Sequence, residues 1–346
     1  MADSQRLTAS VCIPTFNRRE ILLQTLDSLR LQDEPFENFE VIVGDDGSRD
    51  GTFEAVCSLP MPYRLRIFTH QNGGPAAATN LAARHAVNDV LVLLDDDQIA
   101  SPGLIRAHIE AHRRYGDILV QGLFPLADVS RNRGSSLLYE SHLLNDLAPY
   151  DVEHPFSKGI WSANVSVRRE TWQRVGGLDE TFREYGGEDT DFGFRIAASG
   201  CPVIFLPGAL SHHVHVVSYR SAQRQPFQAG RAMVRLAQKF EMPIKSVSGS
   251  GWDTRSSLDK VVRAGWLRSP GAMVMASRVL TSGLVLADLL RWRPIQMAMA
   301  RSVHRLNMVG GITVESKKCR TAIDSGRQRS ADWDRSPEAS GNSQTL

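Results

Sequence analysis

Residues 90–97 read VLVLLDDD, a short apolar segment of strand type that ends in three consecutive carboxylates. Adjacent carboxylates repel one another unless a cation or solvent neutralises them. Because alternate residues of an extended chain point the same way, we expect Asp95 and Asp97 on one side, where they can share an ion. Such oxygen ligands suit Mg²⁺ or Mn²⁺, which commonly also binds a substrate phosphate. Taken alone, the segment favours a solvated acidic turn, and its companions along the chain are what favour an ion site.

Three further strand-like segments precede this one, and polar residues follow each of them. The segments cover residues 8–14, 40–44 and 64–69, and helical patterns appear at residues 21–29 and 76–86. Strands that alternate with helices indicate a mostly parallel sheet with right-handed crossovers. Ligands of such sheets bind outside the carboxyl ends of the strands, and all four polar segments fall at those ends.

Six motifs in sequence order resemble the family 2 glycosyltransferases of GT-A fold. They are PTFNR (14–18), DDGSRDGT (45–52), NGGPAAATN (72–80), LLDDD (93–97), SANVSVRR (162–169) and GGEDTDFGFR (186–195). The resemblance covers about residues 9–240 and implies a Rossmann-like α/β domain with a mixed, mostly parallel sheet. It also implies transfer of a sugar from a nucleoside diphosphate to an acceptor hydroxyl, with inversion at the anomeric carbon and help from Mn²⁺ or Mg²⁺.

The resemblance places the first motif against the base and ribose of the donor, through Pro14, Thr15 and Phe16. Asp46 matches the family acid that accepts a hydrogen bond from the uracil N–H, a contact that suits a carboxylate and favours a UDP-sugar. Gly74 is expected to let the backbone approach the donor closely.

Two later residues complete the expected donor contacts, Asp96 of the triple acid and Asn164 of the fifth motif. Relatives commonly carry an Arg near the nucleotide where this chain has Thr79. The difference removes a cationic contact and weakens the case for a strong role of that segment.

The metal is expected at Asp97 and Asp95, with a ligand added by the segment SHHVH at residues 211–215. His213 and His215 share a side if this segment is extended, and relatives use an imidazole here to complete the metal shell. The alternative is a structural role for both imidazoles.

Asp189 is expected to be the general base, with Glu188 beside it in acceptor binding or orientation. Inverting transfer needs one carboxylate that takes the proton of the acceptor hydroxyl, and a glycine-flanked loop can close it over the acceptor. The alternative is that acids at residues 188–191 simply favour the positive end of a helix. No second acid is needed, since the metal and its donors stabilise the leaving nucleoside diphosphate.

Composition agrees with an intracellular enzyme. The chain has 346 residues, 42% hydrophobic and 23% charged, which is enough for one large catalytic domain with an appendage. A net charge of +2 gives no reason to expect a nucleic-acid partner. The four cysteines lack paired metal spacing and no secretory leader is recognised, so we expect reduced thiols and a cytoplasmic location.

We expect a catalytic domain over residues 1–240, with a nucleotide-binding half to about residue 125 and an acceptor half over residues 126–240. A helical extension is expected over residues 241–314. From residue 315 to 346 the chain is polar and poor in aliphatic residues, which predicts a disordered tail.

Within the extension, residues 269–287 are uncharged except for Arg278. A central Arg costs a spanning helix about 2.5–3.5 kcal/mol, which disfavours insertion across a bilayer. We therefore expect residues 257–308 to pack on the catalytic domain or on a second copy of the chain. The alternative is a peripheral contact with the inner face of a membrane, where arginines meet anionic lipid.

Other function classes remain open. The chain can be a catalytically silent homologue that binds nucleotide and acts as an interaction subunit. A nucleotidyltransferase is disfavoured, because the glycine-rich phosphate loop with basic residues near the first strand is missing. The sugar is not fixed by the sequence, and neither is the acceptor, which can be a saccharide, a lipid-linked saccharide or a small molecule.

Overall fold

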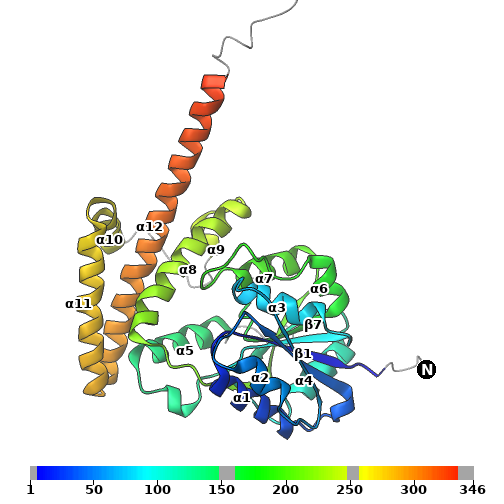
Figure 1. Cartoon of the computed structure of the whole chain (residues 1–346). Helices are drawn as coiled ribbons and strands as arrows, with labels where there is room; N and C mark the ends of the chain where they lie inside the picture. Colours follow the sequence, from blue (N-terminus) through cyan, green and yellow to red (C-terminus); the bar gives the residue numbers. More distant parts are fainter. Residues whose placement is uncertain (1–5, 148–159, 248–256, 334–346) are drawn as a thin grey trace, which may run out of the picture.

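The computed structural model describes residues 6–147, 160–247 and 257–333, and within them the strands form one mixed sheet with helices on both faces (Figure 1). The strand order is β3-β2-β1-β4-β7-β6-β8-β5. The strands are β1 (Ala9–Thr15), β2 (Phe39–Asp45), β3 (Arg64–Thr69), β4 (Val90–Leu94), β5 (Gln98–Ala100), β6 (Leu119–Leu123), β7 (Asn164–Arg168) and β8 (Val203–His213).

The first half of the sheet is parallel, and the second half mixes directions. β3, β2, β1 and β4 run parallel, β7 lies antiparallel between β4 and β6, and β8 runs parallel to β6. This confirms the predicted mixed, mostly parallel sheet. The carboxyl ends of β1, β2 and β4 therefore lie at one edge, which brings the first, second and fourth motifs together.

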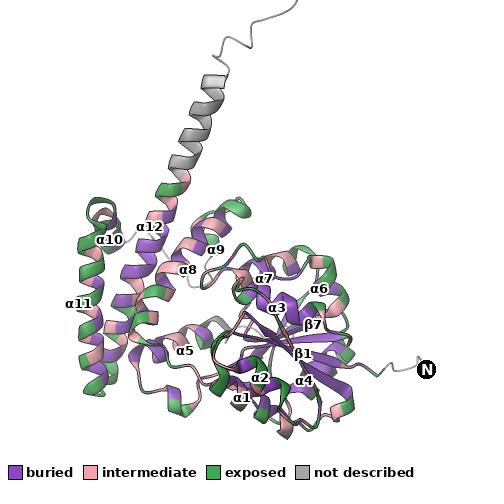
Figure 2. Ribbon diagram, in the orientation of Figure 1, coloured by how far each residue is buried: buried purple, intermediate pink, exposed green. Residues whose placement is uncertain are grey.

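The strands are buried on both faces because their apolar residues do not alternate with polar ones. One face of β1, β2 and β4 packs on α1 (Arg19–Ser28) and α4 (Leu104–Tyr115). The other face packs on α3 (Pro75–Arg84), α6 (Arg169–Val175) and α7 (Glu188–Ala198). Figure 2 shows the resulting buried layer through the middle of the domain. Two further helices, α2 (Thr52–Cys57) and α5 (Gly134–Leu147), lie at the edges of this arrangement.

Long helices follow β8 and form a separate layer beside the sheet (Figure 1). They are α8 (Tyr219–Lys239), α9 (Ile244–Val247), α10 (Ser257–Arg268), α11 (Pro270–Leu289) and α12 (Arg293–Trp333). α8 and α12 pack backbone against backbone, because a Cβ at Gly230 would lie 2.3 Å from the Met308 carbonyl oxygen. A Cβ at Gly311 would meet the Phe227 carbonyl oxygen at 1.9 Å, so neither glycine can be replaced without separating the helices.

The C-terminal region differs from the expected tail, because α12 continues to Trp333. Glu315, where we expected disorder to begin, is buried and accepts hydrogen bonds from Arg231 and Arg235 of α8, at 2.9 and 2.8 Å. Composition could not reveal these pairs, since their partners lie about 80 residues earlier. Residues 334–346 lie outside the described part of the chain.

Candidate active site

The third acid of the cluster, Asp97, is buried beside two imidazoles. Its Oδ1 lies 2.9 Å from Nε2 of His213, and its Oδ2 lies 3.5 Å from Nδ1 of His215. The antiparallel pairing of β5 with β8 sets Gln98 opposite His213 and so brings the two segments together. One ligand atom from each of these residues lies within 4.8 Å of the others, and the two rings stack at 4.7 Å.

This group has the properties of a metal site. Each imidazole has one nitrogen near Asp97, and its other nitrogen, Nδ1 of His213 or Nε2 of His215, is buried without a hydrogen-bond partner among the described residues. Burial acts to raise the pKa of Asp97, but His213, His215 and Arg18 together oppose it and hold the pKa well below its usual range. Burial lowers the pKa of His213, against the opposing effect of Asp97. One carboxylate with two imidazoles fits a divalent ion of the Mn²⁺ type.

An arginine that the sequence analysis did not select neutralises the acid cluster. Arg18 follows β1, and its Nη2 lies 2.6 Å from Oδ2 of Asp97 while its Nη1 lies 3.0 Å from Oδ1 of Asp96. The hydroxyl of Thr15 donates to the other oxygen of Asp96 at 2.7 Å. Burial raises the pKa of Asp96 to about 7, although Arg18 opposes this. Thr15 and Asp96, which we expected to contact the donor, are thus hydrogen-bonded to each other.

Asp95 does not lie beside Asp97 in the manner expected of an extended chain. Residues 95–98 form a turn, in which the Gln98 amide donates to the Asp95 carbonyl at 3.3 Å. The turn removes the two-residue repeat on which the prediction of a shared ion rested, and Asp95 lies outside the group of three ligands. The pKa of Asp95 is raised to about 8. Burial is the largest cause, repulsion from Asp97 and Asp96 comes next, and Asp189 makes a smaller contribution.

The predicted general base Asp189 and its neighbour Glu188 lie in the first turn of α7. Gly186 and Gly187 precede it with φ of +84° and +110°, a region that favours glycine. The Asp189 carboxylate accepts the Thr190 N–H at 2.7 Å. Burial raises the pKa of Asp189 to about 6 against such hydrogen bonds, and burial with repulsion from Asp189 raises that of Glu188 to about 8. The raised pKa of both groups favours one proton shared by the pair near neutral pH.

The Asp46 carboxylate is already occupied by protein groups. Gly73 and Gly74 donate their backbone N–H to it at 2.7 and 3.0 Å, Asn72 donates its side-chain amide at 2.9 Å, and His70 Nε2 lies 3.0 Å away. A carboxylate offers about four acceptor positions, so little capacity is left for a uracil N–H in this arrangement. Asp46 holds the loop that carries Gly74.

The remaining predicted donor residues separate into exposed and buried ones. Phe16 is 43% exposed at the end of β1, where a base can reach it, and Pro14 is partly exposed before it. Gly74 has φ of +97°, and a Cβ there would lie 3.3 Å from the Arg183 backbone, so the close approach is to the chain itself.

Asn164 lies in the core and not at the surface of the site. Its Oδ1 accepts a hydrogen bond from Nε2 of His108 at 2.9 Å, with the proton placed on that nitrogen, and its Nδ2 donates to the Ala209 carbonyl at 3.0 Å. β7 is a central strand, paired with β4 and β6, and this position points toward α4. The side chain of Asn164 therefore joins the strands, and its contact with the donor stays a prediction.

The chain resembles known proteins over most of this region. Residues 10–171 match the model of glycosyl transferase family 2, and residues 141–218 match the model described as the N-terminal domain of galactosyltransferase. Over residues 10–171 the chain thus matches glycosyl transferase family 2.

Curated relatives share this part of the chain. A validoxylamine A glucosyltransferase from Streptomyces hygroscopicus subsp. jinggangensis is 32% identical over 221 residues, which are 56% of this chain and 52% of that protein. A chondroitin synthase from Escherichia coli is 26% identical over 236 residues, 59% of this chain and 34% of the synthase. The chain thus spans about half, or less, of the length of these two relatives.

Solved structures resemble it over nearly its full length. The mannosyltransferase PcManGT from Pyrobaculum calidifontis, in complex with GDP-Man and Mn²⁺, has a TM-score of 0.61 and 19% identity, covering 91% of this chain and 89% of that one. TarS 1–349 from S. aureus, in complex with UDP-GlcNAc, has a TM-score of 0.55 and 16% identity, covering 91% and 92%. The chain therefore has the GT-A fold that we expected.

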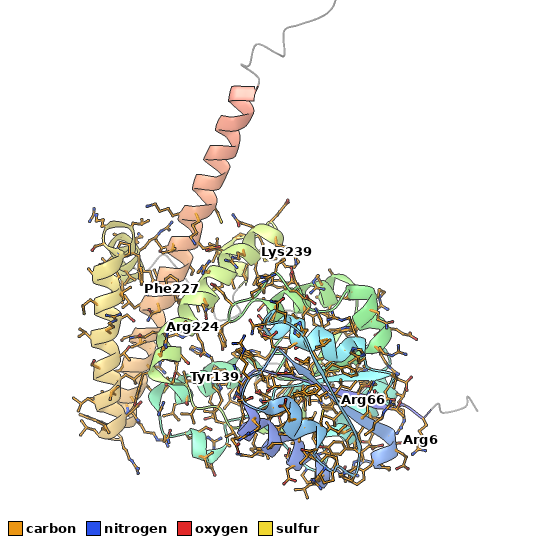
Figure 3. All side chains as sticks on the ribbon, viewed as in Figure 1. Arg6, Arg66, Tyr139, Arg224, Phe227 and Lys239 are labelled. Carbon is orange, nitrogen blue, oxygen red and sulfur yellow. The ribbon has the colours of Figure 1, made fainter. Side chains whose placement is uncertain are left out.

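Aromatic side chains that the sequence analysis missed line the imidazole side of the candidate site. Tyr139 of α5 lies 5.5 Å from the ring of His213 and 5.3 Å from that of His215, and Trp161 lies 5.6 Å from Tyr139. Figure 3 places Tyr139 between the sheet and the long helices. Phe124 extends this wall from the end of β6. No motif marked these residues, because they come from three separate segments.

Proposed function

We propose that the protein transfers a sugar from a nucleoside diphosphate donor to an acceptor hydroxyl in a single inverting displacement. The observation that carries the proposal is the arrangement of the clustered acids. Asp97 lies with two imidazoles in a group that could hold a metal ion, and Asp189 lies in the first turn of α7 with a pKa raised by burial. The reaction needs one cation site for the leaving diphosphate and one free base for the acceptor.

Asp97, His213 and His215 would hold the metal, which we propose to be Mn²⁺ or Mg²⁺. The mixed nitrogen and oxygen ligands favour Mn²⁺ of these two. PcManGT, which shares the fold, was solved with Mn²⁺, and this supports the assignment. When bound, the ion stabilises the negative charge of the leaving diphosphate. We place Asp95 at the side of the site that faces Asp189, where its carboxyl group borders the sugar.

We propose a second role for Arg18. With a cation held by Asp97, Arg18 would no longer be needed to neutralise that carboxylate and could leave one of its two partners. Because Arg18 is 43% exposed, it can turn to a phosphate oxygen, a ligand that matches its planar donors. This cationic contact would replace the one that is missing at Thr79.

The base of the donor is proposed to be uracil, with Phe16 available to stack on it. Asp46 can accept the uracil N–H only if the hydrogen bonds from Gly73 and Gly74 give way. Neighbours of the same fold were solved with GDP-Man and with UDP-GlcNAc, so the fold accommodates either base. Competition of UDP, GDP and dTDP in a thermal-shift assay tests this part of the proposal.

The acceptor is proposed to be a saccharide or another molecule that presents a hydroxyl group beside an apolar face. Tyr139 and Trp161 provide aromatic surface next to the metal ligands, a common composition for a binding pocket. We also propose a reducing compartment such as the cytoplasm, because Cys12, Cys57, Cys201 and Cys319 are free.

The test of the proposed activity combines binding with product detection. We expect Mn²⁺ together with a nucleoside diphosphate to raise the melting temperature more than either alone. Mass spectrometry of reactions with pooled donor sugars and candidate acceptors should then detect a product. Stabilisation without any product or donor hydrolysis would favour the silent nucleotide-binding subunit, and no stabilisation by any nucleotide would contradict both readings.

A further inference from the structure

The helix α11 presents polar side chains to the protein and apolar side chains to the outside. Its inward face carries Ser277, Thr281 and Asp288, all buried, around Leu284. This arrangement is the reverse of the usual amphipathic helix, in which the apolar stripe faces the core.

Hydrogen bonds hold the polar face in place. The side-chain amide of Asn307 on α12 donates to the Ser277 hydroxyl at 2.9 Å, and that of Gln223 on α8 donates to the Thr281 hydroxyl at 2.7 Å. Asp288 accepts from the Gly134 amide at 2.9 Å, which ties the end of α11 to the start of α5. The orientation of the helix is therefore fixed by specific contacts.

The opposite face is a mainly apolar stripe. Met275, Val279, Leu286 and the C-cap residue Leu290 lie on it at helical spacing, with Ser282 between Val279 and Leu286, and the four apolar residues are 56%, 64%, 57% and 65% exposed. α11 forms the outermost layer of the molecule, with α12 and α8 between it and the sheet (Figures 1 and 2). Among the described residues it is also the one helix long and apolar enough to cross a bilayer, with a mean hydropathy of 1.5 over a stretch that is 22% buried.

The charges around this stripe all have one sign. Between residues 257 and 314, all of which the structure describes, the two acids Asp259 and Asp288 are buried in hydrogen bonds. The exposed charged residues of this range are all basic: Lys260, Arg263, Arg268, Arg278, Arg291, Arg293 and Arg301.

We propose that the α11 face, defined as Met275, Val279, Leu286 and Leu290 with the surrounding basic side chains, docks on an anionic lipid bilayer. The helix would lie in the plane of the interface, with its stripe among the acyl chains and the basic groups at the phosphate level. Exposed apolar surface on α11, with exposed positive charge on α10, α11 and α12 and no exposed acid between residues 257 and 314, is complementary to such a membrane.

Two other arrangements fit less well. A helix that spans the bilayer would take its polar face into lipid or pull α12 and α8 in with it, against the cost of burying their charges. A second copy of the chain docked through the same face would bring two sets of unpaired positive charges together. The bilayer surface is the occupant that satisfies both the stripe and the charges.

The experiment is flotation of the full chain with vesicles of neutral phosphatidylcholine alone or with added anionic phosphatidylglycerol. We expect the protein to float with the anionic vesicles at low salt, at least tenfold more than with the neutral ones. Binding should weaken as salt rises, because exposed charges are screened within a Debye length of about 8–10 Å. Resistance to release by high salt together with alkali would indicate a spanning helix and overturn the proposal.

Two variants test the face itself. Val279→Asp with Leu286→Asp should reduce vesicle binding at least tenfold, and Arg291→Glu with Arg293→Glu should remove the preference for anionic lipid. Leu31→Asp is the matched control, because Leu31 is 67% exposed in the catalytic domain and should bind like the parent. If the α11 variants float as the parent does, or if they change a dimer into a monomer without affecting flotation, the proposal fails.

The membrane proposal and the proposed function are tested by separate measurements. Stabilisation by Mn²⁺ and a nucleoside diphosphate, measured on the same variants without lipid, reports only on the catalytic domain. We expect it to be unchanged in all of the α11 variants.

Discussion

The guanidinium of Arg18 lies 2.6 Å from the carboxylate of Asp97, across the gap between the ends of β1 and β4. The same carboxylate lies beside two imidazoles, so Arg18 shares a metal-ligand candidate with them. In the absence of an ion, this arginine is the main positive charge next to the triple acid.

Replacing Arg18 should therefore make the free energy of unfolding depend on added Mn²⁺. Arg18→Ala leaves Asp96 and Asp97 without their cation, and we expect the free energy of unfolding to fall by about 1–3 kcal/mol without Mn²⁺. This is less than the loss for a fully buried pair, since the guanidinium is partly exposed. Urea denaturation with and without Mn²⁺ measures the change, which Mn²⁺ should partly restore. Arg19→Ala, at an exposed pair with Glu20, is the control and should lose well under 1 kcal/mol.

Substitutions of Asp97 and Asp189 should affect nucleotide binding and sugar transfer differently. Asp97→Ala removes the ionised ligand, so metal-dependent binding of a nucleoside diphosphate should be lost together with turnover. Asp189→Asn keeps the shape but removes the proton acceptor, so binding should survive while transfer falls by roughly 10²–10⁴. Calorimetric titration beside transfer rates measures both. An Asp189→Asn variant that transfers sugar at the parent rate would place the base elsewhere.

The pH dependence should follow Asp189. Its pKa is raised to about 6 by burial, and a base acts only when it has lost its proton, so transfer should fall below about pH 6 and level off above it. The pKa of Glu188 is raised to about 8, so this group is still protonated when Asp189 titrates. Glu188→Gln should therefore leave the fall in transfer rate below about pH 6 unchanged. Rates from pH 4.5 to 8 for parent and variant measure this. If the pH at which the transfer rate falls moves by a full unit in Glu188→Gln, Glu188 is itself the titrating base.

Asp46 should contribute to stability before any donor binds. Asp46→Ala deprives the Gly73 and Gly74 amides and the Asn72 side chain of their acceptor, and partly buried donors left in this way cost about 1–3 kcal/mol together. We expect this loss in urea denaturation without nucleotide. Asp27→Ala, at an exposed helix pair, is the control. If Asp46→Ala is as stable as the parent and loses only nucleotide affinity, the carboxylate serves the base and not the loop.

The fold was predictable from sequence because the apolar strand segments and their polar ends follow local rules. The strands at residues 64–69 and 90–94 were predicted to the residue, since turns and charges bound them sharply. The meeting of Asp97 with His213 was predictable only through the family motifs, because the two residues lie more than 100 positions apart.

Other parts of the site depend on tertiary contacts that no local pattern encodes. The turn at residues 95–98 interrupts the extended chain, so the spacing of Asp95 and Asp97 does not put their side chains on one side by the strand rule. Asn164 belongs to one of the family motifs, but its side-chain amide is hydrogen-bonded to His108 and to the Ala209 carbonyl. Tyr139 carries no signal at all, because its importance comes from where α5 lies.

The close packing of α8 against α12 has a geometric consequence for the reaction. Since Gly230 and Gly311 leave no room for a side chain between the two helices, the long helices cannot slide or tilt freely against each other. Lys239, at the end of α8, is ion-paired with Asp191 of α7, the helix that carries the proposed base Asp189. This ion pair joins the outer helix layer to that helix. With the outer layer on a membrane, the proposed base would be held at a constant height above the lipid, and an acceptor anchored there would have to extend that far.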